Sequence, residues 1–341
     1  MQRWRVNYYK RCVIHTQRTK DRTEKMKFAK ETITLLDQVN ALYPGSVVLR
    51  GNEDTSGVIT HDQVSTSMLG TRLMVEVNDG TAPDFLATSE LLLMLLTLNG
   101  YPQVYFQLKD DDVELTNQLM VMATYLYQPA LRAIVCREQA AHGLLTDDVV
   151  KGVVAGVQQT ISKETADDNG EAALRLLTLL DLQVFVHAVP NDTTAIVEKM
   201  AALYPKAWSA AEKIAIAMKI DDIKDPFSVH RAVVTAFSMF DEQMVAWDLP
   251  EIYASEFATL TPVLSERQLR LPLAQVFDIK HMTMKDRHTD KDAYAGLLKA
   301  SGQNSFVLTA PEDKLADFFK ELYQTPVKEV LTKLGQPFAI R

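Results

Sequence analysis

The spacing of apolar residues along the chain predicts helices over most of its length. From Met26 onward the apolar positions follow a helical period, and the first predicted helix covers 27–43 and ends at Tyr43-Pro44-Gly45. Helical spacing returns after residue 112 and predicts helices at 113–141, 146–163, 171–187, 192–203, 206–219 and 227–245.

Short β-rich runs between and after these helices predict a smaller amount of sheet. Residues 46–50 and 71–78 carry the pattern of strands, 104–108 is a further candidate, and 85–98 is an apolar helix that ends before Gly100 and Pro102. Near the C-terminus, 276–284 and 305–309 are predicted as strands flanking a short helix at 291–300, and a helix pair is predicted within 311–334. The expected fold class is therefore α+β and helix-dominated.

The composition of the chain indicates a soluble globular protein. Hydrophobic residues make up 47% of the chain and charged residues 23%, which is typical of a soluble globular protein. No apolar run approaches the roughly 18 residues of a membrane-spanning helix, so no membrane span is expected. The two cysteines, Cys12 and Cys136, are too far apart to suggest a zinc knuckle, and Cys136 is predicted to be a buried thiol.

The net charge of −8 is unevenly distributed. Residues 1–25 contain eight Lys/Arg against two acidic residues, a balance of +6, which leaves −14 on the remainder. The acidic body argues against a nucleic-acid-binding surface, because phosphate neutralisation requires clustered Lys and Arg. It is compatible with a cytoplasmic bacterial protein.

The basic segment 1–25 lacks the apolar core of a secretory signal. Its Arg-rich composition would fit an organelle transit peptide, but a simpler interpretation is translation from Met26, since helical patterning begins there. Residues 1–25 are therefore predicted to be unfolded or an upstream extension.

The predicted helix 85–98 has the outline of a metallopeptidase active-site helix without its ligands. Where a zinc peptidase has His-Glu-x-x-His, this chain has Ser89-Glu90-Leu91-Leu92-Leu93. In the active motif the two histidines lie four residues apart on one helix face and bind zinc, while the glutamate activates the bound water. Here the glutamate is retained as Glu90, but serine is a poor zinc ligand and leucine is none. A buried core helix would also explain this composition.

The surroundings of this helix resemble those of a known family. The segment 83–104, Pro-Asp-Phe-Leu-Ala-Thr-Ser-Glu-Leu-Leu-Leu-Met-Leu-Leu-Thr-Leu-Asn-Gly-Tyr-Pro-Gln-Val, is similar to proteins of lactobacilli labelled the IpaB/EvcA family, in which a His-Glu-Leu-Leu-His-like helix precedes Gly-[Tyr/Phe]-Pro-Gln. The resemblance covers roughly residues 26–145. It implies a zincin-like N-terminal unit at 26–145, followed at 146–341 by a helical body with a small C-terminal α+β portion.

A third metal ligand would be expected from the next long helix, 113–141. Its inward candidates are Glu114, Glu138 and His142. Glu138 and His142 lie four residues apart on one helix face, and an exposed helix end is the simpler explanation of that pair. His281 and His288 lie in a stretch of alternating charge, for which a solvated turn is the default and a metal or anion site the alternative.

These observations predict a catalytically silent metallopeptidase-like protein that holds no zinc and binds a peptide or protein partner. Two alternatives stay open. One is an active metal-dependent hydrolase that uses Glu90 with Glu138 or His142, and the other is a helical scaffold or interaction protein.

Overall fold

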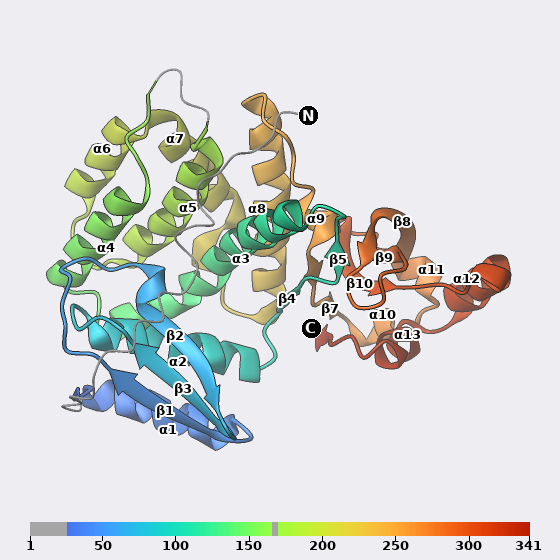
Figure 1. Cartoon of the computed structure of the whole chain (residues 1–341), viewed down its shortest axis with the longest axis horizontal. Helices are drawn as coiled ribbons and strands as arrows, with labels where there is room; N and C mark the ends of the chain where they lie inside the picture. Colours follow the sequence, from blue (N-terminus) through green and yellow to red (C-terminus); the bar gives the residue numbers. More distant parts are fainter. Residues whose placement is uncertain (1–25, 166–169) are drawn as a thin grey trace. The chain divides into compact units, whose positions relative to one another are not determined.

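The computed structural model describes residues 26–165 and 170–341, so the predictions for 1–25 lie outside the described part. The chain is mixed α and β with helices predominating, as predicted. It divides into two compact units (Figure 1). The first unit contains 26–98 and 135–212, and the second contains 99–134 and 213–341. These units do not follow the predicted division at residue 145, because the chain leaves the first unit at Asn99 and returns to it within one long helix, α3 (Val113–Ala141).

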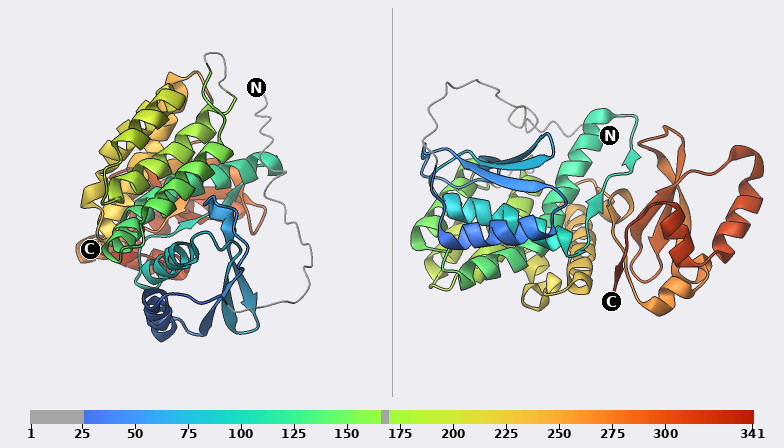
Figure 2. Two further views of the ribbon diagram at one scale, coloured as in Figure 1. Left: turned by 90° about the vertical axis from the view of Figure 1, so that its left-hand side faces the viewer. Right: turned by 90° about the horizontal axis from the view of Figure 1, so that it is seen from below.

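The first unit begins with a three-stranded sheet packed against two helices. The strands β1 (Ser46–Gly51), β2 (Val64–Leu69) and β3 (Arg72–Val77) lie in the order β1-β3-β2, with β1 parallel and β2 antiparallel to β3. Helices α1 (Lys30–Leu42) and α2 (Pro83–Leu98) lie on one face of this sheet (Figure 2). The buried residues between the two layers are Leu35, Val39, Val47, Val75 and Leu91. The predictions for 27–43, 46–50, 71–78 and 85–98 are confirmed, whereas β2 was not predicted.

The remainder of the first unit is helical. It contains α4 (Asp147–Thr160), α5 (Ala172–Ala188), α6 (Thr194–Leu203), the first half of α7 (Pro205–Met218) and the end of α3. Each of these helices was predicted, and Cys136 is a buried free thiol, as expected. The buried guanidinium of Arg175 donates to the carbonyl oxygen of Ser162 (Nε–O 2.8 Å) and lies 3.3 Å from Glu171, which fixes the start of α5 to the end of α4.

Two glycines of α4 allow the segment before β2 to approach this helix closely. The amide of Ile59 donates to the carbonyl oxygen of Gly152 (3.0 Å), and a Cβ at Gly156 would overlap the backbone carbonyl of Ile59 and lie 3.1 Å from Cγ2 of Thr60. A Gly-to-Ala change inside a helix ordinarily stabilises by roughly 1 kcal/mol. Here the contact with backbone removes that benefit, since a backbone carbonyl cannot turn aside as a side chain can.

We therefore expect Gly156→Ala to lower the free energy of unfolding by about 1–3 kcal/mol, measured by urea denaturation. Gly152→Ala is the matched control, because its new Cβ would meet only the side chain of Ile59 (Cδ1 2.9 Å), which can rotate. Equal losses in the two variants would contradict the backbone contact as the cause.

The second unit combines a long helix with a four-stranded sheet. Helix α8 (Pro226–Ala246) begins at a capping box formed by Asp225 and Ser228. The sheet has the order β10-β9-β8-β5, from β10 (Gln303–Leu308), β9 (Asp292–Leu298), β8 (Phe277–Asp286) and β5 (Leu108–Lys109). Four short helices accompany it, α10 (Glu266–Arg270), α11 (Leu273–Val276), α12 (Leu315–Gln324) and α13 (Val327–Lys333), and Phe277, Phe306, Val327 and Leu331 are fully buried between them.

The remaining elements of the second unit are very short. Strand β4 (Val104–Tyr105) pairs with β6 (Thr259–Leu260), and β7 (Val263–Leu264) pairs with β11 (Ala339–Ile340). Helix α9 (Ala254–Phe257) precedes β6. The predicted strand at 104–108 is thus divided between β4 and β5, which belong to different sheets.

The helix predicted at 291–300 is wrong, because this segment forms β9. Its composition suits a helix, but β8 and β10 both pair with it and provide hydrogen bonds along both of its edges. Tertiary pairing therefore overrides the local preference. The flanking strands at 276–284 and 305–309 and the helix pair within 311–334 are confirmed.

Within the described residues, α3 is the one helix that is long and apolar enough to cross a membrane. In its most apolar stretch of 18 residues, 56% is buried within the protein. A buried core helix has the same length and composition, so α3 is consistent with the predicted absence of a membrane span.

Candidate functional site

The segment Ser89–Leu93, compared above with His-Glu-x-x-His, lies on α2, where the structure places its residues at the edge of the core. Thr88 is fully buried, and Ser89, Glu90 and Leu93 are half-buried. Because Ser89 and Leu93 are four residues apart, they project from the same face of the helix. The two positions that would hold histidines in a zinc peptidase are therefore neighbours, as the motif requires.

A glutamine from α3 occupies the space beside Ser89. The side chain of Gln139 is fully buried, and its Nε2 lies 3.0 Å from Oγ of Ser89, 2.9 Å from Oγ1 of Thr88 and 2.8 Å from the carbonyl oxygen of Phe85. The amide donates toward all three oxygens and so ties the end of α3 to the first half of α2. All of these residues belong to the first unit.

This arrangement does not fit a zinc ion. The hydroxyl of Ser89 accepts a hydrogen bond from Gln139, and Leu93 has no atom that can bind a metal. In the part of the chain that the structure describes, no group of three or more His, Cys, Asp or Glu side chains is placed to hold a metal ion. The site is a hydrogen-bonded packing contact between two helices, and no catalytic step can be derived through a bound metal.

The other candidate ligands lie elsewhere on α3 or beyond it. Glu114, near the start of α3, is exposed and belongs to the second unit. Glu138 and His142 are also exposed, with the backbone amide of His142 donating to the carbonyl oxygen of Glu138 (3.1 Å) at the end of the helix. The pair therefore has the position that the simpler explanation, an exposed helix end, predicted.

Sequence reasoning missed Gln139, although its position carried a signal. Gln139 lies three residues after Cys136 and four after Val135, so it continues the apolar stripe of α3. A single polar residue in such a stripe indicates a buried side chain that needs a hydrogen-bond partner. Its neighbour Glu138 is the better metal ligand by chemistry but lies on the exposed side of the helix.

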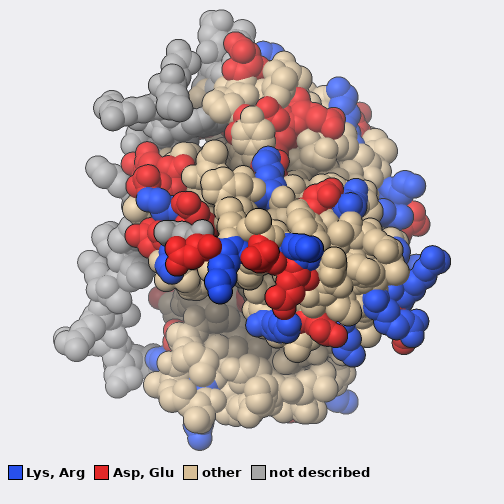
Figure 3. Space-filling model, turned by 90° about the vertical axis from the view of Figure 1, so that its right-hand side faces the viewer, with Lys and Arg blue, Asp and Glu red and all other residues tan. Residues whose placement is uncertain are grey.

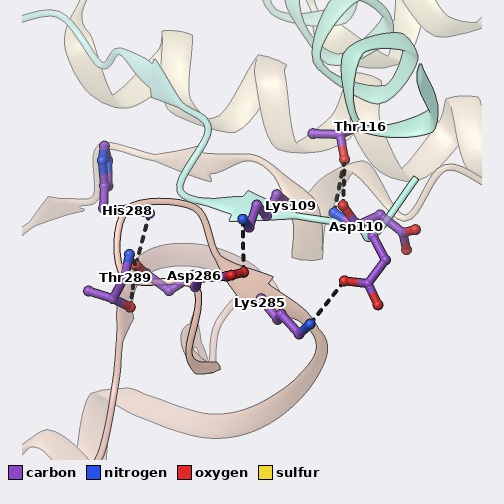
Figure 4. Close-up of polar contacts among 9 residues, drawn as sticks. Lys109, Asp110, Thr116, Lys285, Asp286, His288 and Thr289 are labelled. Carbon is purple, nitrogen blue, oxygen red and sulfur yellow. Dashed lines mark hydrogen bonds and ion pairs between the residues drawn. The ribbon is translucent and has the colours of Figure 1, made fainter. Parts of the chain in front are cut away.

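The charged stretch around His288 forms a network of ion pairs in the second unit (Figure 4). Lys109 of β5 lies 2.8 Å from Asp290, and Lys285 of β8 lies 3.0 Å from Asp111. The hydrogen bond and charge of Lys109 lower the pKa of Asp290, and those of Asp111 raise the pKa of Lys285. Each of these two carboxylates, Asp290 and Asp111, is therefore paired with one lysine.

The histidines of this stretch are not brought together as ligands. The carboxylate of Asp286 accepts hydrogen bonds from the backbone amides of His288 (3.0 Å) and Thr289 (2.7 Å), and these bonds close the β8–β9 turn. His288 itself is exposed. His281 lies farther along β8, against the ring of Tyr294 (centroids 4.8 Å apart). The solvated turn that was the default prediction is found at His288, whereas His281 lies within strand β8, opposite Tyr294 of β9.

Comparisons with known proteins add no relative. No family model, no curated protein and no solved structure matches this chain.

Proposed function

We propose that this protein is a catalytically silent, metallopeptidase-like protein of the cytoplasm, with a zincin-like N-terminal unit, that acts by binding a peptide or protein partner. The observation that carries the proposal is the hydrogen bond from Gln139 to Ser89 (3.0 Å). Through this bond, the residue at one metal-ligand position of the motif contacts another protein side chain, while the helix that carries the motif is present.

The order of elements supports the same proposal. A strand (β3), a short turn, the helix α2 and a Gly-Tyr-Pro-Gln sequence follow one another as the resemblance implies. Glu90, the residue of the former general base, is half-buried beside the lost ligand positions. No observation favours the alternative of an active hydrolase. Its candidate ligands, Glu138 and His142, are exposed at the end of α3.

Restoring the ligands tests the proposal. The triple variant Ser89→His, Leu93→His, Gln139→Glu provides two imidazoles on one helix face and a carboxylate at the position that now contacts Ser89. We expect it to bind about one zinc ion per chain in calorimetric titration, with three protein ligands as in catalytic zinc sites. Zinc should also raise its melting temperature, since a ligand that binds the folded state stabilises it.

The matched control is Ser89→Ala, Leu93→Ala, Gln139→Glu, which changes the same positions without providing imidazoles. We expect neither the control nor the wild-type protein to bind zinc. A triple variant that folds, as judged by circular dichroism, yet binds no zinc would contradict a degenerate metal site. Zinc binding by the wild-type protein at one ion per chain would contradict the loss of metal binding.

A further inference from the structure

Strand β2 lies at an unprotected edge of the three-stranded sheet. In the order β1-β3-β2, one side of β2 pairs with β3, and no strand among the described residues pairs with its other side. Edge strands usually carry charges, proline or a bulge that prevents further pairing. The residues of β2 are Val64, Ser65, Thr66, Ser67, Met68 and Leu69, none of them charged or proline, and their register with β3 is continuous.

The register determines which residues of β2 face outward. The amide of Asn78 donates to the carbonyl oxygen of Gln63 (2.7 Å), so this pair is a hydrogen-bonded one. In an antiparallel ladder such pairs alternate, so Ser65, Ser67 and Leu69 bond to β3. The N–H and C=O groups of Val64, Thr66 and Met68 therefore point away from the sheet.

The opposite edge of the same sheet is protected at one residue, Val47. The side-chain oxygen of Asn40, on α1, accepts a hydrogen bond from the amide of Val47 (2.7 Å), and the side-chain nitrogen of Asn40 donates to the carbonyl oxygen of Val47 (3.2 Å). One side chain thus occupies both outward backbone groups of Val47, at the beginning of β1. No such contact is found on β2 among the described residues.

The open edge is also apolar near its turn. Met68 is 60% exposed and Leu69 is 61% exposed, just before the tight turn at Gly70, where φ is +64°. Figure 3 shows few charged side chains in its lower part, where Figure 1 places the β2–β3 turn. Exposed apolar residues beside unpaired backbone groups favour pairing with another strand.

We propose that two copies of this chain pair through β2 in an antiparallel, two-fold symmetric arrangement centred on Thr66. In this register Thr66 faces Thr66 of the second copy, and Val64 faces Met68, so hydroxyl meets hydroxyl and apolar meets apolar. No like charges are opposed, because the strand is neutral. The pairing forms about six backbone hydrogen bonds from three outward residues on each copy.

The resulting sheet has six strands and ends on both sides in β1. The two-fold interface is isologous and uses the β2 edge of both copies, so this contact closes at two copies. This inference rests on the edge of the sheet and is independent of the proposed loss of metal binding.

Analytical ultracentrifugation of the full chain tests the pairing, at concentrations from about 1 to about 200 μM so that micromolar dissociation constants are covered. We expect a shift from monomer to dimer across this range. Thr66→Pro should abolish the dimer, because proline removes an outward N–H while sparing the bonds to β3. Thr66→Val is the matched control: it keeps the N–H, and the dimer should persist.

Met68→Lys is a second disrupting variant, useful if Thr66→Pro unfolds the chain, because it places a charge on the edge without altering the backbone. It too should be monomeric at about 200 μM. A wild-type chain that stays monomeric over the whole concentration range overturns the proposal. An extended peptide of another protein would then be the candidate for pairing with this edge. A dimer that survives both Thr66→Pro and Met68→Lys overturns it as well.

Discussion

Replacing Gly296 with alanine is expected to lower the free energy of unfolding of the second unit by about 2–3 kcal/mol. Gly296 lies in the middle of β9, opposite Phe306 of β10 and Ile279 of β8. A Cβ at this position would overlap the ring of Phe306. That ring is fully buried and packs edge-to-face on Phe277 (centroids 5.3 Å apart), so it has no free space into which to move.

A double-mutant cycle identifies the clash as the cause. In a Phe306→Leu background the shorter side chain makes room, and Gly296→Ala should then cost less than about 1 kcal/mol. Urea denaturation of the four proteins gives the coupling free energy, expected to be about 2 kcal/mol. Additive effects of the two substitutions would contradict the proposed contact between residues 296 and 306.

Acidification from pH 6.5 to about 4 is expected to destabilise the second unit by about 3 kcal/mol through His230 alone. His230 lies on α8, is buried, and its Nε2 has no hydrogen-bond partner in the described part of the chain. Burial, with a smaller contribution from the charge of Arg341, lowers the pKa of His230 from 6.5 to about 4. Between these values the unfolded chain binds a proton that the folded chain does not, so stability falls as pH falls.

The variant His230→Leu isolates this effect. Its stability at pH 7 should equal or exceed that of the wild type, because a buried nitrogen without a partner is removed. Its loss between pH 6.5 and 4 should be smaller than that of the wild type by about 3 kcal/mol. His288→Leu is the control, since that imidazole is exposed, and identical pH profiles for His230→Leu and the wild type would contradict the assignment.

The sequence predicted most helices because their apolar stripes are long. Helix α3 was predicted at its observed limits, 113–141, and α4 to α8 within a few residues. Strands of two residues, such as β6 and β11, contain no period from which they could be predicted. The segment 291–300 was misassigned because its strand depends on pairing with β8 and β10, partners that local composition does not reveal.

The candidate site was predicted only in part, for a similar reason. Ser89, Glu90 and Leu93 were identified because the motif has a fixed spacing within one helix. The partner of Ser89 is 50 positions away, and its identity depends on how α3 packs against α2. Glu138 has the carboxylate of a metal ligand, whereas the amide of Gln139 carries no such signal in the sequence.

The pairing of β2 also could not be predicted from sequence. Residues 64–69 contain two serines and a threonine between apolar ends, a pattern that suits a strand or a polar loop equally. Only the ladder with β3 shows that the backbone of Thr66 faces outward, and only the fold shows that Asn40 caps Val47 on the other edge.

The metal content of the purified wild-type protein tests the central claim most directly. Elemental analysis of the full chain, purified without chelators from cells grown with added zinc, should find far less than one metal ion per chain, and Glu90→Gln should give the same value. One zinc ion per wild-type chain, lost in Glu90→Gln while the variant remains folded, would contradict the account and identify α2 as part of a working metal centre.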